Sequence, residues 1–263
     1  MEFLRRLIKG WTGSPTGSEE LLNNKDGMPS EEKVIETFQD KFGILFTDTS
    51  LILTALKHRS YLNATNEKRI KSNERLEFLG DAVLDLVVTE FLYQTFPGKS
   101  EGQLSKSKSV LVSKPVIADK ANLMNLGELV LMNRGEEKTG GRKRKSIIAD
   151  AFEAIIGAIY LDQGLEAAAN FIHSYLLDDH ARILEKGMYR NYKSILLEYA
   201  QGEGYSLPNY RVIGETGPDH AKQFVIEVWV NNEAMGRGEG KSKKRAEQDA
   251  AREAVEKLNI GVG

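Results

Sequence analysis

The chain has 263 residues, of which 41% are hydrophobic and 28% are charged, so it contains enough apolar material for one large core or two smaller ones. Its 36 basic and 38 acidic residues give a net charge of −2, which excludes a global positive field that would attract nucleic acid or membrane. The absence of cysteine excludes disulfides, thiolate nucleophiles and cysteine-ligated zinc, and the four histidines match no zinc spacing. Oxygen-ligated metals and local charged patches remain possible.

The first 30 residues are predicted to form a flexible N-terminal arm. Residues 12–30 are rich in Gly, Pro, Ser and Asn. Residues 1–11 place apolar side chains on one helical face but lack the continuous apolar core and cleavage site of a signal peptide. This amphipathic start could touch a membrane surface, although docking on the protein's own core or simple fraying is favoured.

No segment is predicted to cross a membrane. The longest apolar run, 147–161, is too short to span about 30 Å of hydrocarbon and contains two acidic residues. We therefore expect a cytoplasmic protein with no membrane partner.

The chain is predicted to contain two domains of different class. Apolar residues recur at helical spacing from residue 31 to residue 184, which predicts an all-α domain with long helical segments at 74–96, 104–111, 115–124 and 146–161. A linker is expected over 185–188. Beyond it the pattern changes to a helix, three strands and a helix, at 192–200, 210–213, 224–230, 234–238 and 242–258. This order predicts an α+β (α-β-β-β-α) domain over 189–258, followed by a tail at 259–263.

The helical segment 74–96 combines acidic residues with an apolar pattern that predicts burial nearly all round. Glu77 and Asp81 are four residues apart, about 40° on a helical wheel. Glu74 lies close to them in phase. Three carboxylates therefore share one stripe of a buried helix.

A second helix, 147–161, is apolar except for two carboxylates and one tyrosine hydroxyl. The carboxylates, Asp150 and Glu153, stand at i and i+3 on one face. Buried carboxylates without a partner cost several kcal/mol each or stay protonated. A hard divalent cation removes that cost, because Mg²⁺ takes oxygen ligands.

Two explanations of these acids are open. In the first, they pair with Arg75, Arg142 or Lys145, or each helix has one solvated face. In the second, they bind a metal ion, which is favoured because two apolar helices are each interrupted only by spaced acids. Four carboxylates without histidine indicate Mg²⁺, with Mn²⁺ as a possible substitute, rather than zinc. Such a cluster mainly serves phosphoryl chemistry, in which the metal lowers the pKa of a bound water and stabilises the leaving oxygen.

Three blocks of the sequence resemble the ribonuclease III family. The unbroken run Asn73-Glu-Arg-Leu-Glu-Phe-Leu-Gly-Asp81 resembles the family's signature. The block 146–157 looks like the family's second catalytic helix, and 96–105 fits the segment between them. The resemblance covers residues 31–258 and includes a module similar to a double-stranded-RNA-binding domain. It implies a ribonuclease III endonuclease domain followed by that RNA-binding domain.

The resemblance also implies roles for individual residues. Four carboxylates would ligate the catalytic Mg²⁺, with the last most closely tied to turnover: Glu77, Asp81, Asp150 and Glu153. Three further acids would have supporting positions near the cleavage valley, namely Glu74, Glu101 and Glu136. Phe78 matches a residue that inserts into the partner subunit of family dimers, so a homodimer is expected.

By the same resemblance, the chain would hydrolyse double-stranded RNA to products with a 5′-phosphate, a 3′-hydroxyl and a short 3′ overhang, without a small-molecule cofactor. Ribosomal RNA precursors are the expected substrates, followed by structured messenger and transfer RNA precursors. The competing hypothesis is a non-catalytic double-stranded-RNA-binding protein that keeps the nuclease fold as a dimerisation scaffold. A degenerate site should have lost at least one carboxylate, and all four are intact, which favours the enzyme.

A basic cluster begins the last predicted helix. Lys241, Lys243 and Lys244 lie beside Arg245, and Ser242 is the predicted N-cap. Cations at a helix N-terminus oppose the helix dipole, so helix stability does not explain them. Phosphate binding explains these cations, because the free backbone N–H groups at the start of the helix add to the positive charge of the lysines. On charge alone, a solvated basic turn is an equal alternative.

Three further residues would contact RNA by the resemblance. His220 lies in a loop whose histidine enters the minor groove, and Glu198 and Gln201 fall on a helix that contacts another minor groove. Contacts of this kind read the A-form shape of about 16 base pairs rather than sequence.

Overall fold

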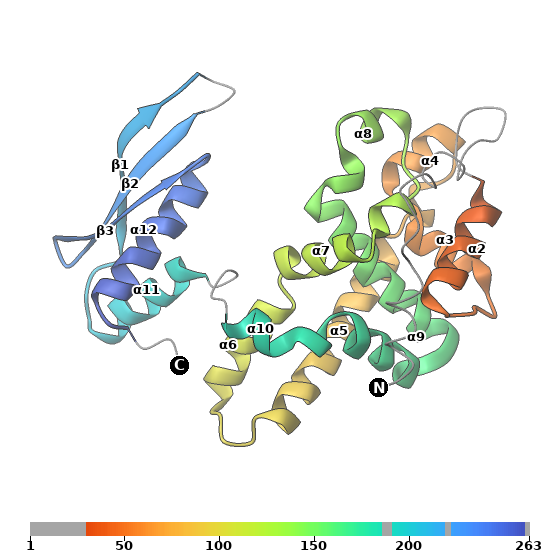
Figure 1. Ribbon diagram of the computed structural model, residues 1–263, viewed down its shortest axis with the longest axis horizontal. Coiled ribbons are helices and arrows are strands. Elements are labelled where there is room, and N and C mark those ends of the chain that lie inside the picture. Colours follow the sequence, from red (N-terminus) through yellow and green to blue (C-terminus); the bar gives the residue numbers. More distant parts are fainter. Residues whose placement is uncertain (1–29, 186–190, 219–221, 261–263) are drawn as a thin grey trace, which may run out of the picture. The chain divides into compact units, whose positions relative to one another are not determined.

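The computed structural model describes residues 30–185, 191–218 and 222–260. The chain divides into two compact units, residues 1–189 and 190–263, each with its own apolar core. The first is built from helices and the second from a helix, three strands and a helix, so the predicted fold class is confirmed (Figure 1). The expected arm over 1–30, linker over 185–188 and tail over 259–263 lie wholly or largely outside the described residues, as does His220.

Two long helices, α5 (Glu74–Thr95) and α9 (Lys145–Tyr175), lie at the centre of unit 1 and pack against each other (Figure 1). The other α-helices of the described part are α2 (Glu31–Phe42), α3 (Thr49–Leu56), α4 (Arg59–Thr65), α6 (Glu101–Leu111), α7 (Lys114–Leu123), α8 (Arg134–Lys138) and α10 (His180–Glu185). Short 3₁₀ turns join them at Arg69–Lys71, Leu126–Glu128, Gly141–Lys143 and Leu177–Asp179. Among the described residues, no helix is long and apolar enough to cross a membrane.

The two central helices cross at glycines that bring their backbones into contact. A Cβ atom added at Gly80 of α5 would lie 1.7 Å from the carbonyl oxygen of Glu153 in α9. A Cβ atom at Gly157 of α9 would lie 2.4 Å from the carbonyl oxygen of Leu76. Only hydrogen fits at these two positions, because any side chain would collide with the backbone of the facing helix. The acidic residues that flank the glycines are thereby brought together.

The segment α9 consists of two helical stretches separated at Gly164, where φ is 84° and ψ is −178°. The sequence pattern predicts that the helix ends near residue 161, and the regular helical backbone is interrupted at Gly164. Glycine accepts this backbone conformation without a steric penalty, which explains why the chain can bend there. The sequence signal for a helix end is therefore correct, and a second helical stretch, which the pattern did not predict, runs on to Tyr175.

Helix α5 is not buried nearly all round, contrary to its sequence pattern. The side that faces the core is buried, including Val83, Leu84 and Val88. On the opposite side, Phe78 is 82% exposed, and Leu86 and Tyr93 are also exposed. Unit 1 covers only the side that packs against the other helices, so one apolar row of α5 has no cover within the described part of the chain.

Unit 2 is an antiparallel three-stranded sheet packed against two helices. Its elements are α11 (Tyr192–Gly202), β1 (Asn209–Thr216), β2 (Gln223–Val230), β3 (Glu233–Gly240) and α12 (Lys243–Lys257). Asn231 and Asn232 have left-handed backbone conformations in the two-residue turn between β2 and β3, as tight hairpins require. Helix α12 packs closely on β3, where Gly236 and Gly238 admit its backbone. The predicted α-β-β-β-α order is confirmed.

Candidate active site

Three of the four predicted metal-binding carboxylates come together where α5 and α9 cross. Glu77 of α5 and Asp150 and Glu153 of α9 each offer an oxygen atom, and these atoms lie within 4.8 Å of one another. We call these three residues the acidic trio. Asp81, one turn further along α5, is exposed and lies outside the trio, although its charge acts on Glu153. The i, i+3 spacing of Asp150 and Glu153 sets up the half of the trio on α9, and the helix crossing adds Glu77 from α5.

A lysine that the sequence analysis did not single out lies against the trio. Lys114, the first residue of α7, places its Nζ atom 2.5 Å from Oδ1 of Asp150 and 3.5 Å from Oε1 of Glu77. Two of the basic residues proposed as partners for the acids are engaged elsewhere: Arg142 with Glu137 and Lys145 with Asp119. No local pattern could have identified Lys114, because it stands 36 residues from Asp150 and reaches it only through the packing of α7 on α9.

Two members of the trio, Glu153 and Glu77, lie where their charged forms are disfavoured. Glu153 is 3% exposed, and its burial, together with the negative charges of neighbouring acids, raises its pKa to about 8 despite the opposing effect of Lys114. Burial and the nearby charge of Asp150 also raise the pKa of Glu77. Burial lowers the pKa of Lys114, but its hydrogen bond to Asp150 and the surrounding carboxylates outweigh this effect and raise it overall. Closely spaced carboxylates that are costly to ionise together are the kind of site that binds a hard divalent cation.

The three acids expected to support the site have other partners. Glu74 accepts hydrogen bonds from Arg69 and Ser72, and Arg59 lies 4.0 Å away. Glu101, the first residue of α6, accepts a hydrogen bond from Ser105. Glu136 forms an ion pair with Arg144. Within the described structure, none of the three belongs to the trio.

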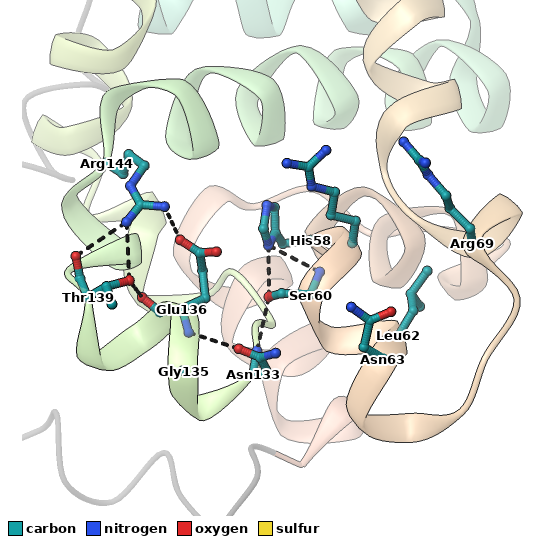
Figure 2. A pocket seen from close by; sticks show the side chains of 11 residues that line it. His58, Ser60, Leu62, Asn63, Arg69, Asn133, Gly135, Glu136, Thr139 and Arg144 are labelled. Atoms are coloured by element: carbon teal, nitrogen blue, oxygen red, sulfur yellow. Dashed lines mark hydrogen bonds and ion pairs between the residues drawn. The ribbon is translucent and has the colours of Figure 1, made fainter.

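Unit 1 also contains a pocket of about 670 Å³, which we call the basic pocket and which is not lined by any member of the trio (Figure 2). Three arginines and one glutamate line it along with polar and apolar residues: His58, Arg59, Ser60, Leu62, Asn63, Arg69, Asn133, Gly135, Glu136, Thr139 and Arg144. Figure 2 shows the pairing of Glu136 with Arg144 and the contact of His58 with Ser60. The surplus of positive charge suits an anionic ligand.

His58 connects the basic pocket to the trio electrostatically. The backbone N–H of Ser60 donates to Nδ1 of His58, so the neutral ring carries its hydrogen on Nε2 and can donate it to a ligand. Burial lowers the pKa of His58, although the negative charges of Glu136 and Asp150 act in the opposite direction. Burial therefore favours the neutral form of the ring, which lies within the electrostatic reach of Asp150.

Unit 2 presents the basic cluster predicted at the start of its last helix. Lys241, Lys243 and Lys244 are exposed, and Ser242 accepts a hydrogen bond from the backbone N–H of Arg245, which confirms the N-cap. The ammonium group of Lys243 lies 5.8 Å from the centre of the Phe224 ring. Two further predicted RNA contacts, Glu198 and Gln201, are exposed on α11.

Comparisons with known proteins cover both units. The family model described as "Ribonuclease-III-like" matches residues 48–180, and the model described as "Double-stranded RNA binding motif" matches residues 192–258. Ribonuclease 3 of Bacillus cereus (strain G9842) is 45% identical over 229 residues, which span 86% of this chain and 92% of the relative. The chain belongs to the ribonuclease III family.

Two further relatives agree with this assignment. Ribonuclease 3 of Bacillus anthracis (strain CDC 684 / NRRL 3495) matches with the same identity and coverage. The solved nuclease domain of ribonuclease III from Campylobacter jejuni is 43% identical, with a TM-score of 0.50, and the match covers 55% of this chain and 95% of that one. This ribonuclease III family member is therefore a double-stranded-RNA endoribonuclease, a hydrolase. The use of divalent metal ions in the family fits the oxygen-only donor set of the trio.

The raised pKa of Glu153 predicts how the stability of the metal-free protein depends on pH. Between the ordinary value of 4.5 and about 8, the folded protein holds a proton that the unfolded chain has released, so the free energy of unfolding should fall as the pH rises through this window. Glu153→Gln should remove this part of the slope and stabilise the protein at the alkaline end. Urea unfolding in EDTA across this range measures the effect. Glu166→Gln, at an exposed position of the same helix, is the control; a wild-type slope in Glu153→Gln would contradict the prediction.

Proposed function

We propose that this enzyme cleaves double-stranded RNA by Mg²⁺-assisted hydrolysis at the acidic trio, with Asp81 completing the set of four ligands. The observation that carries the proposal is the convergence of Glu77, Asp150 and Glu153 at one point of the α5–α9 crossing. Mn²⁺ is a possible substitute, because it also accepts carboxylate and water ligands. No small-molecule cofactor is required.

The chain's own residues have separate tasks in this reaction. The acidic trio would hold the ion, which when bound would supply an activated water and stabilise the leaving oxygen. The buried Glu153 fixes the position of the site most tightly, because it has the least freedom to move. The basic pocket, through Arg59 and His58, would hold a phosphate of the RNA strand beside the site. Glu74 and Glu136 keep the arginines of this pocket in place, and Glu101 has a supporting position on α6.

Attack of water on phosphorus breaks the bond to the 3′ oxygen and leaves a 5′-phosphate and a 3′-hydroxyl. By family resemblance, the two strands are cut with a short 3′ overhang. Ribosomal RNA precursors are the proposed main substrates, followed by structured messenger and transfer RNA precursors, and the proposed place of action is the cytoplasm. We assign catalysis to residues 31–184 and RNA binding to 189–258.

The first test separates chemistry from binding. Glu153→Gln should reduce Mg²⁺-dependent cleavage of a long RNA duplex by at least about 10³-fold, because metal-assisted charge stabilisation supplies several kcal/mol. Duplex affinity, measured by fluorescence anisotropy, should stay within a few-fold because unit 2 retains its contacts. Parallel loss of affinity and cleavage would mean that Glu153 has a structural role, and cleavage without added metal would contradict the proposed chemistry.

Unit 2 is proposed to bind the RNA backbone through Lys241, Lys243 and Lys244, with Glu198, Gln201 and His220 contacting the minor groove. The exposure of the three lysines supports this proposal. The helix dipole does not favour cations at this end, so their placement there is explained by an anionic partner.

The salt dependence of binding tests the basic cluster. Each phosphate that a lysine neutralises should contribute about 0.7 to 0.9 to the slope of log affinity against log salt concentration. Lys243→Ala combined with Lys244→Ala should flatten the slope measured with duplex RNA in EDTA. Arg252→Ala, further along the same helix and paired with Asp249, is the matched control. An unchanged slope in the double variant would place the phosphate contacts elsewhere.

We further propose that the enzyme is a homodimer with one cleavage centre per subunit. Phe78, Leu86 and Tyr93 form an exposed apolar row along α5, the helix that also carries Glu77 and Asp81. A two-fold axis beside this row would place two acidic trios symmetrically along one duplex. Each subunit would then cut one strand.

Phe78→Ser should weaken this dimer without unfolding the subunit, because the side chain is exposed in the single chain. Sedimentation velocity should show a lower mass for the variant, and double-strand cleavage should fall with it. Leu123→Ser removes a comparably exposed apolar side chain from α7 and should leave the mass unchanged. A Phe78→Ser protein that keeps the wild-type mass would rule out this interface.

A further inference from the structure

We propose that Lys114 is a built-in counter-ion of the active site: in the metal-free enzyme its ammonium group takes the position of the divalent ion among the carboxylates, and it competes with the ion for that position. The inference rests on the proposed function, because it assumes that the acidic trio is the metal site. It concerns a residue to which neither the sequence pattern nor family membership gives a role.

The contacts of Lys114 are those of a bound cation. Its Nζ lies 2.5 Å from Oδ1 of Asp150 and 3.5 Å from Oε1 of Glu77, so it bridges the two helices that form the site. The charges of Glu153 and Lys114 also act on each other, so the ammonium group interacts with all three members of the trio. An ammonium group has three hydrogens to donate and no acceptor, so it can satisfy several carboxylates at once.

The backbone holds Lys114 at this point although the local structure disfavours a cation there. Lys114 is the first residue of α7, where the positive end of the helix dipole repels its charge. Pro115 follows it and fixes the first turn of the helix. Because α7 packs on α9, the start of α7 faces the half of the trio that α9 supplies. The attraction of the carboxylates therefore explains a placement that helix formation does not.

The side chain of Lys114 can also leave the site. It is 54% exposed, whereas Glu153 is 3% exposed, so the lysine approaches a buried group from the solvent side. A lysine side chain is a flexible stem with a compact charge at its end. When a divalent ion binds, the ammonium group can rotate outward without moving the helices.

Two measurable consequences follow from this competition. Removing the charge of Lys114 should make the site bind a divalent ion more tightly, because the ion no longer displaces a resident cation or meets its repulsion. The same change should destabilise the metal-free protein, because the carboxylates lose their only described ion-pair partner at the site. The two effects have opposite signs, and a lysine with a purely structural role would not produce the first.

The experiment titrates Mn²⁺ alone into full-length wild type and Lys114→Gln in the absence of RNA, with free Mn²⁺ counted by electron paramagnetic resonance. We expect Lys114→Gln to bind Mn²⁺ about tenfold tighter, as removal of a unit charge in contact with the site should produce. Thermal unfolding in EDTA should show a lower midpoint for Lys114→Gln, and saturating Mn²⁺ should close the gap. The variant should also reach half-maximal cleavage at a lower Mg²⁺ concentration.

Lys145→Gln is the matched control. It removes the same charge from a side chain of similar exposure at the start of α9, where Lys145 pairs with Asp119 rather than with the trio. It should change Mn²⁺ affinity less than twofold, and Lys114→Arg, which keeps the charge, should not reproduce the gain. Equal or weaker Mn²⁺ binding by Lys114→Gln, with wild type binding normally, overturns the inference alone. Failure of wild type to bind Mn²⁺ overturns the proposed metal site and the inference together.

Discussion

The candidate active site depends on one steric condition, the contact of two helix backbones at Gly80 and Gly157. Without Cβ atoms at these positions, α5 and α9 approach until glycine hydrogens meet the facing carbonyl groups. Side chains one turn away are then forced to share a small volume. Glu77 on one helix and Glu153 on the other become neighbours for this reason. A methyl group at either glycine would push the helices apart and separate the carboxylates.

This close approach concentrates negative charge in a place that water reaches poorly. The carboxylates respond in two ways: Glu153 holds its proton to a higher pH, and Lys114 supplies a positive charge from the solvent side. Both responses are reversible, since the proton on Glu153 and the side chain of Lys114 could each leave if a divalent ion bound there. The fold thus carries an unfavourable charge arrangement that a bound divalent ion would relieve, and catalytic sites commonly hold strained groups of this kind.

The near-zero net charge of the chain conceals a division of charge between different sites. The trio gathers acids, whereas the basic pocket and the start of α12 gather cations. Bare carboxylates repel a duplex RNA, so a metal ion bound by the trio would have a second effect besides its chemistry: it would remove this repulsion.

The sequence by itself determined the features that depend on residues near one another along the chain. Helical and strand periods predicted two domains and the order of elements in the second, Ser242 was identifiable as an N-cap, and the spacing of Asp150 and Glu153 placed both carboxylates on one helical face. The motif from Asn73 to Asp81 indicated the family that the comparisons then showed. These signals are local, because backbone geometry fixes which neighbours share a face.

The tertiary structure decided which distant groups meet. It placed Lys114 on the trio, left Asp81 outside it and directed Glu74 to Arg69. It also placed a second helical stretch directly after the break at Gly164. Each outcome depends on which helices cross and how closely, and on side-chain contacts between residues far apart in the chain. Periodicity gives the face of a helix but not its neighbour, so the sequence could identify the candidate carboxylates while only packing could bring three of them together and add the charge of Lys114.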